Sequence, residues 1–232
     1  MLFALLLCNA AMSHKFYHGT ERPVFPHSDL PFAVPPIDRS IMVFDNALTP
    51  DECHLMVDHF ESSPADHYQG AVIINGEVKV DSTLKKNTEL WITELAQKGS
   101  IRWGAADSLL TTMVQKHLGL YQDANAIMST QQNPFSDEGF RLKRYNSKGD
   151  EHHAYHADSG GEAACKPHRI LAVLLYLNDV YEGGETVFLN QGRTITPVCG
   201  RLAIFPTAFS FVHAGKRPRS GSKFCVINFL TT

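Results

Sequence analysis

The sequence predicts an α+β fold in which helices come first and strands follow. Apolar residues recur at helical spacing within residues 41–138. From residue 139 to residue 232 they form short continuous or alternating runs that Gly, Pro and Asn interrupt. The chain has 232 residues, which is enough for one large domain with a sizeable core. Helices followed by an unbroken series of strands are typical of helices packed on one face of an antiparallel sheet or closed jelly roll.

The helix-rich part begins with a clear helix start. Thr49 is predicted to be the N-cap, Pro50 occupies the first helical position, and Glu52 completes a capping box. Two later segments, NTELWITELAQKG and AADSLLTTMVQKHLG, have apolar residues at helical spacing and stop at a glycine. We therefore expect three helical segments before residue 139.

The strand-rich part is built around ILAVLLYL, residues 170–177. A continuously apolar run of this length predicts a strand that is covered on both faces. Tyr176 carries the only polar group within it, and a buried phenol requires a hydrogen-bond partner. The segment EGGET that follows predicts a turn, in which Gly183 and Gly184 allow positive φ. A further turn and strand are expected in TPVCGRLAIFP.

The N-terminal residues 1–40 contain five scattered prolines between positions 23 and 36 and read as an irregular arm. SIMVFDNAL, residues 40–48, then reads as the first strand, so we expect a single domain over residues 41–232. The apolar run Leu2–Leu7 is too short to span a membrane. It resembles a minimal signal peptide, but an upstream start codon before Met12 explains it as well. We expect a soluble cytoplasmic protein, with the secretory pathway as the alternative.

Composition excludes some partners. The formal net charge is −3 and the pI is near 6.4, so charge alone attracts neither nucleic acid nor an anionic membrane. The cysteines form no C-x-x-C pair, which argues against a zinc ribbon or a redox dithiol. We interpret all five as buried free thiols: Cys8, Cys53, Cys165, Cys199 and Cys225.

Three histidines and an aspartate crowd into EHHAYHADSGG, residues 151–161. In an extended segment His156 and Asp158 point to the same side, so an imidazole and a carboxylate can bind one ion from one strand. By the same alternation His153 should face away. His152 should share their face, but it lies too far along the strand to reach the ion, so both histidines are expected at the lip of the site. An H-x-D pair is weak as a motif and needs a third ligand.

His213 in AFSFVHAG is the best candidate for that ligand, because Phe209, Phe211 and His213 would share one face of a strand. A core histidine bonded to backbone is the alternative. The next strand, SKFCVINFL, places Lys223 on the same face as Cys225 and the apolar residues beyond it. An ammonium group at the inner end of an apolar face requires an anion unless it reaches the rim. A metal ligand and an anion receptor would then lie on adjacent strands.

These features resemble the iron(II)- and 2-oxoglutarate-dependent dioxygenases, and within them the prolyl 4-hydroxylase catalytic domain. The motifs occur in family order over residues 141–230: RYNSKGDEHHAYHAD, RILAVLLYLNDVYEGGETVF, PVCGRLAIFP, and a histidine followed after ten residues by a lysine. LTPDECHLMV resembles the helix that opens such domains. The resemblance implies a double-stranded β-helix (jelly roll) core in the C-terminal half, with the N-terminal helices packed on its major sheet.

The resemblance also implies roles for individual residues. His156, Asp158 and His213 would hold Fe(II) and leave three coordination positions open, a ligand set suited to non-haem oxygen activation. Lys223 would bind the distal carboxylate of the co-substrate 2-oxoglutarate, and with the three ligands it forms the predicted catalytic set. Tyr145 and Tyr176 match positions whose tyrosines hydrogen-bond the co-substrate, with aromatic packing as the alternative.

The implied reaction consumes O2 and 2-oxoglutarate, releases succinate and CO2, and hydroxylates an unactivated C–H bond, with ascorbate as a helper that re-reduces iron. On resemblance alone the expected substrate is a peptidyl proline; a free amino acid, a peptidyl lysine or another small molecule is the alternative. Two departures from the family bear on the site. The loop between Tyr145 and His156 is about two residues longer than usual, and Ala172 replaces a threonine expected near the distal carboxylate. Arg169, which begins the long strand, is interpreted as structural.

Other functions remain open at this point. The same residues could form a non-catalytic metal-binding interaction module, although a structural metal site needs no anion receptor. A zinc hydrolase would need a general base, for which Glu151 is the nearest carboxylate, outside the register of the ligands. Lys216, Arg217 and Arg219 form a basic hairpin that we interpret as solvated, with a contact to an acidic peptide or a nucleic-acid backbone as the alternative.

Overall fold

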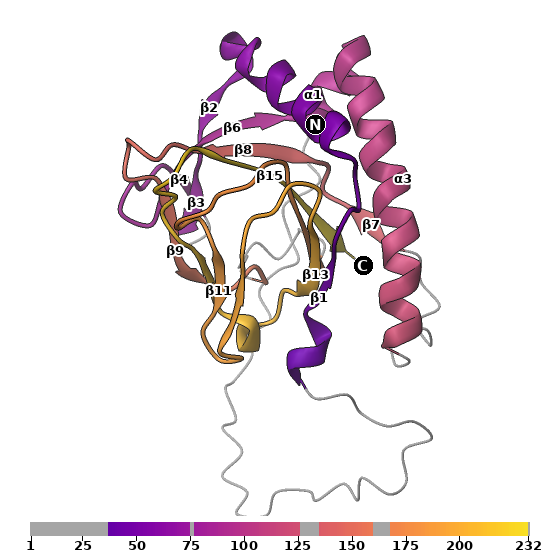
Figure 1. Ribbon diagram of the computed structural model, residues 1–232, viewed down its shortest axis with the longest axis vertical. Coiled ribbons are helices and arrows are strands. Elements are labelled where there is room, and N and C mark those ends of the chain that lie inside the picture. The colour runs from indigo at the N-terminus through magenta and orange to yellow at the C-terminus, as the bar shows by residue number, and fades with distance from the viewer. Residues whose placement is uncertain (1–36, 75–76, 126–134, 160–167, 232) are drawn as a thin grey trace, which may run out of the picture. The chain divides into compact units, whose positions relative to one another are not determined.

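Two antiparallel sheets face each other in the computed structural model (Figure 1). It describes residues 37–74, 77–125, 135–159 and 168–231, all of which belong to the compact unit Pro35–Thr232. The possible signal segment, Met12 and most of the predicted arm lie outside the described residues. The boundary predicted at residue 40 and the single domain over residues 41–232 stay predictions. No helix within the described ranges is long and apolar enough to cross a membrane.

The major sheet has eight strands in the order β1-β13-β10-β15-β8-β6-β2, with β7 also paired to β15. All its pairs are antiparallel. The central strands are the longest, because burial on both faces stabilises a long regular ladder. The strands are β1 (Met42–Phe44), β2 (Tyr68–Gln69), β6 (Thr88–Trp91), β7 (Ser136–Asp137), β8 (Arg141–Tyr145), β10 (Arg169–Tyr176), β13 (Leu202–Pro206) and β15 (Lys223–Thr231).

The minor sheet has five short strands in the order β12-β11-β14-β9-β5, again all antiparallel. They are β5 (Lys85–Lys86), β9 (His152–His156), β11 (Thr186–Phe188), β12 (Arg193–Ile195) and β14 (His213–Gly215). A separate hairpin consists of β3 (Val72–Ile74) and β4 (Glu77–Lys79). The minor sheet therefore receives strands from most of the sequence and contains both candidate ligand histidines.

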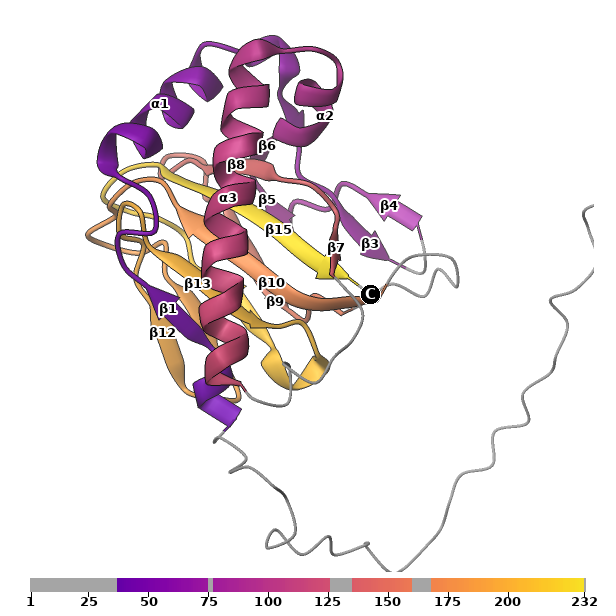
Figure 2. The same ribbon diagram turned by 90° about the vertical axis from the view of Figure 1, so that its right-hand side faces the viewer.

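Three helices cover the outer face of the major sheet: α1 (Pro50–Glu61), α2 (Ile92–Gln97) and α3 (Ile101–Ala124). Figure 2 shows α3 lying across the sheet, with α1 and α2 near one end of it. Buried side chains of the helices, such as Met56, Trp103 and Leu110, form one core with Leu142 and Val226 of the sheet. One-turn 3-10 helices occur at Ile37–Ser40, Pro64–Asp66 and Phe209–Phe211.

A second core fills the space between the two sheets. Ala172 and Tyr176 of β10 point into it, together with Phe188, Phe205 and Cys225. On the opposite face of β10, Leu171, Val173 and Leu175 belong to the helix-covered core. The prediction that ILAVLLYL is a strand covered on both faces is thus confirmed, as is the α+β fold with helices on the major sheet.

The predicted start of the first helix is confirmed in detail. Thr49 Oγ1 accepts a hydrogen bond from the backbone N–H of Glu52, and the Glu52 carboxylate accepts from the backbone N–H of Thr49 at 2.8 Å. Pro50 occupies the first helical position. The predicted strand at residues 40–48 is also present, shortened to Met42–Phe44.

The structure corrects three other predictions about elements. The first half of NTELWITELAQKG is strand β6, because Thr88–Trp91 pairs with β8, and only the second half is helical. α3 does not stop at Gly119 but continues to Ala124. The buried Tyr121 anchors its last turn, because its hydroxyl donates a hydrogen bond to Ser40 O. Phe209–Phe211 is a 3-10 turn, so Phe209, Phe211 and His213 share no strand face, and Phe209 is exposed.

Three of the five cysteines that we interpreted as buried free thiols lie within the described residues. Cys53 and Cys225 are buried and Cys199 is partly buried, and all three are free thiols. Cys8 and Cys165 lie outside the described residues.

Candidate metal centre

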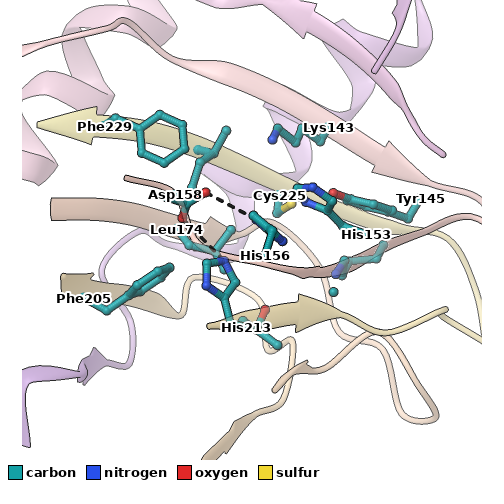
Figure 3. Close-up of a pocket in the computed structure, with 14 residues that line it drawn as sticks. Lys143, Tyr145, His153, His156, Asp158, Leu174, Phe205, His213, Cys225 and Phe229 are labelled. Atoms are coloured by element: carbon teal, nitrogen blue, oxygen red, sulfur yellow. Dashed lines mark ion pairs between the residues drawn. The ribbon is translucent and has the colours of Figure 1, made fainter. Parts of the chain in front are cut away.

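Three predicted ligands meet at one end of two neighbouring strands of the minor sheet. His156 ends β9, Asp158 follows it two residues later, and His213 begins β14, which pairs with β9 at the same level. Asp158 Oδ1 lies 3.3 Å from His156 Nε2, and Asp158 Oδ2 lies 3.4 Å from His213 Nε2. One ligand atom from each residue falls within 4.8 Å of the other two, so together they can hold one metal ion (Figure 3).

Backbone carbonyls fix the tautomer of both histidines. His156 Nδ1 lies 2.8 Å from Ala154 O, and His213 Nδ1 lies 3.0 Å from Phe211 O. Because a carbonyl oxygen can only accept, both Nδ1 atoms must carry the proton, which leaves a lone pair on each Nε2. Metal-binding histidines are oriented in the same way by their other ring nitrogen.

The carboxylate completes a site that suits a divalent cation. Asp158 Oδ2 is buried and accepts no hydrogen bond from the described residues. Burial lowers the pKa of His213, which keeps its imidazole neutral. An orphaned buried carboxylate oxygen beside two imidazole lone pairs is the donor set expected for a non-haem Fe(II) site.

Lys223 lies at the other end of the same pocket. Its side chain is buried, and Nζ donates a hydrogen bond to Gly184 O at 2.9 Å. Nζ also lies 4.5 Å from the centre of the Tyr145 ring. No carboxylate of the described residues lies within ion-pair distance of this ammonium group, and burial lowers its pKa. The expected need for an external anion therefore persists in the structure.

The two predicted tyrosines are placed differently. Tyr145 lines the pocket, with its hydroxyl buried so that its pKa is raised well above the ordinary value. Tyr176 donates a hydrogen bond to Thr186 Oγ1 at 2.7 Å, and it is Thr186 that lines the pocket. The predicted contacts of both tyrosines with a co-substrate stay predictions.

Thr186 also lines the pocket, although no motif in the sequence indicated it. It pairs with Gly215, and a side-chain carbon at Gly215 would lie 3.7 Å from Lys223 Nζ, so its hydroxyl belongs to the lysine end. Ala172, by contrast, pairs with Phe229, far along β15 from Lys223. The expectation that Ala172 lies near the distal carboxylate is therefore wrong, since the strand register places it near the metal end.

His153 faces the pocket, against expectation. Between the pairs His213↔His156 and Gly215↔His153, β9 has one more residue than β14, which is a β-bulge. The extra residue breaks the alternation, so His153 stacks on His156 with ring centres 3.6 Å apart. His152 was expected on the ligand face but instead has its ring nitrogens near the backbone oxygens of Asp150 and Thr83.

Two supporting residues behave as interpreted. Arg169 forms a two-pronged ion pair with Glu138 and donates to the backbone oxygen of Asp158 at 3.3 Å, so it braces the ligand loop structurally. Glu151 does not line the pocket, and its carboxylate accepts the backbone N–H of Asn146. A general base for a zinc hydrolase is therefore not found at Glu151.

The basic hairpin at residues 216–219 is largely neutralised. Arg217 Nη1 lies 2.9 Å from Asp150 Oδ1. Arg219 Nη1 lies 3.1 Å from Glu182 Oε1. These exposed ion pairs agree with the interpretation of a solvated hairpin better than with a phosphate-binding surface.

Comparison with known proteins supports the fold and shows a family resemblance over part of the chain. Residues 140–231 match the sequence model of the 2OG-Fe(II) oxygenase superfamily. A prolyl hydroxylase from Trichoplax adhaerens, solved with a peptide fragment of the hypoxia inducible factor oxygen degradation domain, has a TM-score of 0.63 at 16% identity, over 83% of each chain. No curated protein sequence matches the chain.

Two further solved structures share the fold. The viral collagen prolyl hydroxylase of Paramecium bursaria Chlorella virus-1, solved with 2-oxoglutarate, has a TM-score of 0.57 at 17% identity, over 82% of this chain and 95% of that one. A Pseudomonas putida prolyl-4-hydroxylase has a TM-score of 0.58 at 17% identity, over 83% and 93%. The double-stranded β-helix core is thus confirmed, and residues 140–231 are similar in sequence to the 2OG-Fe(II) oxygenase superfamily.

Proposed function

We propose that this chain is an Fe(II)- and 2-oxoglutarate-dependent dioxygenase that hydroxylates an unactivated C–H bond. The overall reaction converts 2-oxoglutarate, O2 and R–H into succinate, CO2 and R–OH. One observation carries the proposal: a single pocket contains an open set of two imidazoles and a carboxylate at one end and a buried lysine without a carboxylate partner at the other. When bound, Fe(II) supplies activation of O2 at positions that the protein leaves free.

The protein residues divide the remaining tasks. His156, Asp158 and His213 hold the metal, and the carbonyls behind the two histidines keep their rings oriented. Lys223 binds the distal carboxylate of 2-oxoglutarate through a charge-assisted hydrogen bond, with the Thr186 hydroxyl beside it. Part of the wall is apolar, with Leu174, Phe205 and Phe229, and this part limits access of water to the reacting centre.

A peptidyl proline is the substrate we propose first. The prolyl hydroxylases that share the fold support this choice, although the likeness at 16–17% identity concerns the fold alone. The exposed ring of Tyr155, with Lys216 Nζ 5.0 Å from its centre, offers an aromatic surface on the strand that supplies His156. Ascorbate is included in the proposal as a helper, and a free amino acid or other small molecule is the alternative substrate class.

Anaerobic spectroscopy tests the metal and co-substrate sites. Fe(II) and then 2-oxoglutarate are added to the full chain, and the visible metal-to-ligand charge-transfer band is recorded before O2 is admitted. We expect a band that saturates with 2-oxoglutarate. Its absence in the wild-type protein, with the fold verified by circular dichroism, would overturn the dioxygenase proposal and leave a non-catalytic metal module.

A lysine pair provides the matched control. Lys223→Ala should raise the 2-oxoglutarate concentration needed for half of the band by about tenfold or more, because a charge-assisted hydrogen bond is lost. Lys216→Ala removes the same group from the exposed hairpin and should leave the titration unchanged. Equal titrations for Lys223→Ala and wild type would remove Lys223 from the co-substrate site.

Product analysis tests the substrate. Succinate is measured after O2 is admitted, with proline-rich peptides, with the same peptides carrying alanine in place of proline, and with free amino acids, each with and without ascorbate. Succinate that rises only with proline peptides, together with a mass increase of one oxygen on them, is the expected result. Succinate formed equally with alanine peptides would keep the dioxygenase and remove the peptidyl-proline assignment.

A further inference from the structure

A second buried lysine lines the pocket, and the proposed function gives it no role. Lys143 lies in the middle of β8, and its residue is 9% exposed. Figure 3 shows it on the side of the pocket opposite His213, near His153 and Cys225. A lysine buried to this extent normally has an anionic partner.

The nearest anion is already engaged with other donors. Glu89 Oε1 lies 2.6 Å from Lys85 Nζ and accepts a hydrogen bond from Asn87 Nδ2 at 3.0 Å. Lys143 Nζ lies 3.7 Å from the same oxygen, which is within ion-pair range but beyond hydrogen-bond distance. Its three N–H donors make no hydrogen bond with any other described residue. Lys143 is therefore only partly compensated by the protein.

The charges of the pocket and its supporting cluster do not balance. Lys85, Lys143 and Lys223 contribute three positive charges, and Glu89 and Asp158 contribute two negative charges. A divalent metal on Asp158 increases the positive excess further. A buried excess of this kind favours a ligand with two negative charges.

The strand register gives the two pocket lysines a spacing that matches the two ends of a dicarboxylate. Lys143 pairs with Cys225, and Lys223 pairs with Tyr145, so the two ammonium-bearing positions are two residues apart along the ladder, or roughly 7 Å. An extended five-carbon dicarboxylate presents its two charged ends over a comparable span. The end of such a ligand that points away from Lys223 points toward the metal ligands.

We propose that Lys143 is a second carboxylate receptor, which binds the metal-end carboxylate of 2-oxoglutarate while Lys223 binds the distal one. This inference rests on the proposed function, because it assumes 2-oxoglutarate in this pocket. Lys143 is a positioning residue in this scheme: it holds the carboxylate next to the keto group, and selects 2-oxo acids over compounds that lack that carboxylate.

Three ligands separate the two ends of the pocket. 2-Oxoglutarate has both carboxylates, 2-oxopentanoate keeps only the metal-end carboxylate, and 4-oxobutanoate keeps only the distal one. Their dissociation constants are measured by calorimetry on the full chain loaded with Mn(II), so that no turnover occurs. Lys143→Met should weaken 2-oxoglutarate and 2-oxopentanoate by about tenfold or more and leave 4-oxobutanoate unchanged.

Two further variants exclude a purely structural role. Lys143→Arg keeps the positive charge and should restore at least part of the affinity for 2-oxopentanoate. Lys85 is the cation closest to Glu89, and it does not line the pocket. Lys85→Met should therefore change none of the three affinities. Loss of affinity in Lys85→Met equal to that in Lys143→Met would show that the cluster acts only through the fold, and would overturn the proposal.

The outcomes distinguish this inference from the proposed function. Binding of 2-oxoglutarate with the same affinity to Lys143→Met and wild type overturns the role of Lys143 and leaves the dioxygenase proposal intact. Failure of the metal-loaded wild-type protein to bind 2-oxoglutarate overturns both. An equal loss for all three ligands in Lys143→Met contradicts a receptor at the metal end.

Discussion

The two sheets differ in regularity as well as in burial. In the major sheet, β10 and β15 pair over most of their length, and nearly every residue of β15 is buried. In the minor sheet, β14 has three residues and β9 has five, and their pairing contains a bulge. The long ladder provides the core, and the short bulged pair presents the proposed metal ligands.

The proposed metal ligands lie where the strand pairing is irregular. A regular ladder alternates its side chains strictly, so it offers one face to each core. The bulge in β9 turns His153 toward the same pocket as His156, which a regular strand of this sequence could not do. The minor sheet thus brings the proposed metal ligands together, while the major sheet provides most of the core and carries Lys143 and Lys223.

Removal of the ligand carboxylate should have the largest effect and should be confined to the metal site. We expect Asp158→Asn to weaken binding of Mn(II) by about 1,000-fold or more, because changes behind a metal ligand already cost 10- to 100-fold. Calorimetry on the full chain measures the affinity. Asp150→Asn makes the same chemical change at an exposed ion pair and serves as the control. Comparable affinities for the two variants would contradict a metal site at Asp158.

Truncation of a core side chain in the major sheet should lower the stability and leave metal binding unchanged. Leu171 in β10 is 1% exposed and belongs to the helix-covered core, so Leu171→Ala should lower the free energy of unfolding by about 4 kcal/mol. Urea denaturation measures this loss, and the folded fraction should still bind Mn(II) normally. Leu189→Ala truncates an exposed leucine and should cost less than about 0.5 kcal/mol. A large loss of metal affinity in folded Leu171→Ala would break the division between the sheets.

The buried cluster around Glu89 joins the two sheets and should make their contact pH-dependent. Lys85 belongs to β5 of the minor sheet, and Glu89 and Lys143 belong to the major sheet. Burial alone would raise the pKa of Glu89, but Lys143 and Lys85 lower it to about 2. A carboxyl group with a lowered pKa stabilises the fold above its unfolded pKa, and this contribution, about 3 kcal/mol, is lost as the pH falls toward 2.

The difference between Glu89→Gln and wild type isolates this contribution from other carboxylates. The difference in the free energy of unfolding should be largest near pH 6 and shrink by about 2 kcal/mol by about pH 3. Denaturant titrations at a series of pH values give the difference. A difference that is constant over this range would mean that Glu89 does not keep its charge through interactions across the two sheets.

Sequence alone predicts the regular parts of this molecule well. The capping box at Thr49 and the doubly buried run in β10 depend on neighbours in sequence and on burial, both of which a local pattern records. The same is true of His156 and Asp158, whose separation by two residues holds in a single extended segment. His213 was predicted as a ligand because of its apolar neighbours. This reason was partly wrong, since Phe209 lies in an exposed turn.

The remaining errors have a common physical cause, which is pairing between distant segments. The strand β6 carries a helical pattern of apolar residues, but its partner β8 decides its conformation. Pairing with β14 likewise sets the bulge that turns His153 inward. Lys143 and Thr186 were missed because each looks like an ordinary strand residue until the register brings it beside the pocket.

The smallest effect is expected at α1, which packs on the outer face of the major sheet, away from the pocket. Thr49→Ala removes the side-chain acceptor for the backbone N–H of Glu52 and one half of the capping box, which should cost about 1 kcal/mol of stability. Thr49→Ser keeps the hydroxyl and should cost only a few tenths of a kcal/mol. Since no ligand of the pocket touches this helix start, the affinities for Mn(II) and 2-oxoglutarate should equal those of the wild type in both variants. An affinity that falls in Thr49→Ala but not in Thr49→Ser would show that the helix layer tunes the pocket, and stability and binding could then no longer be assigned to separate parts of the fold.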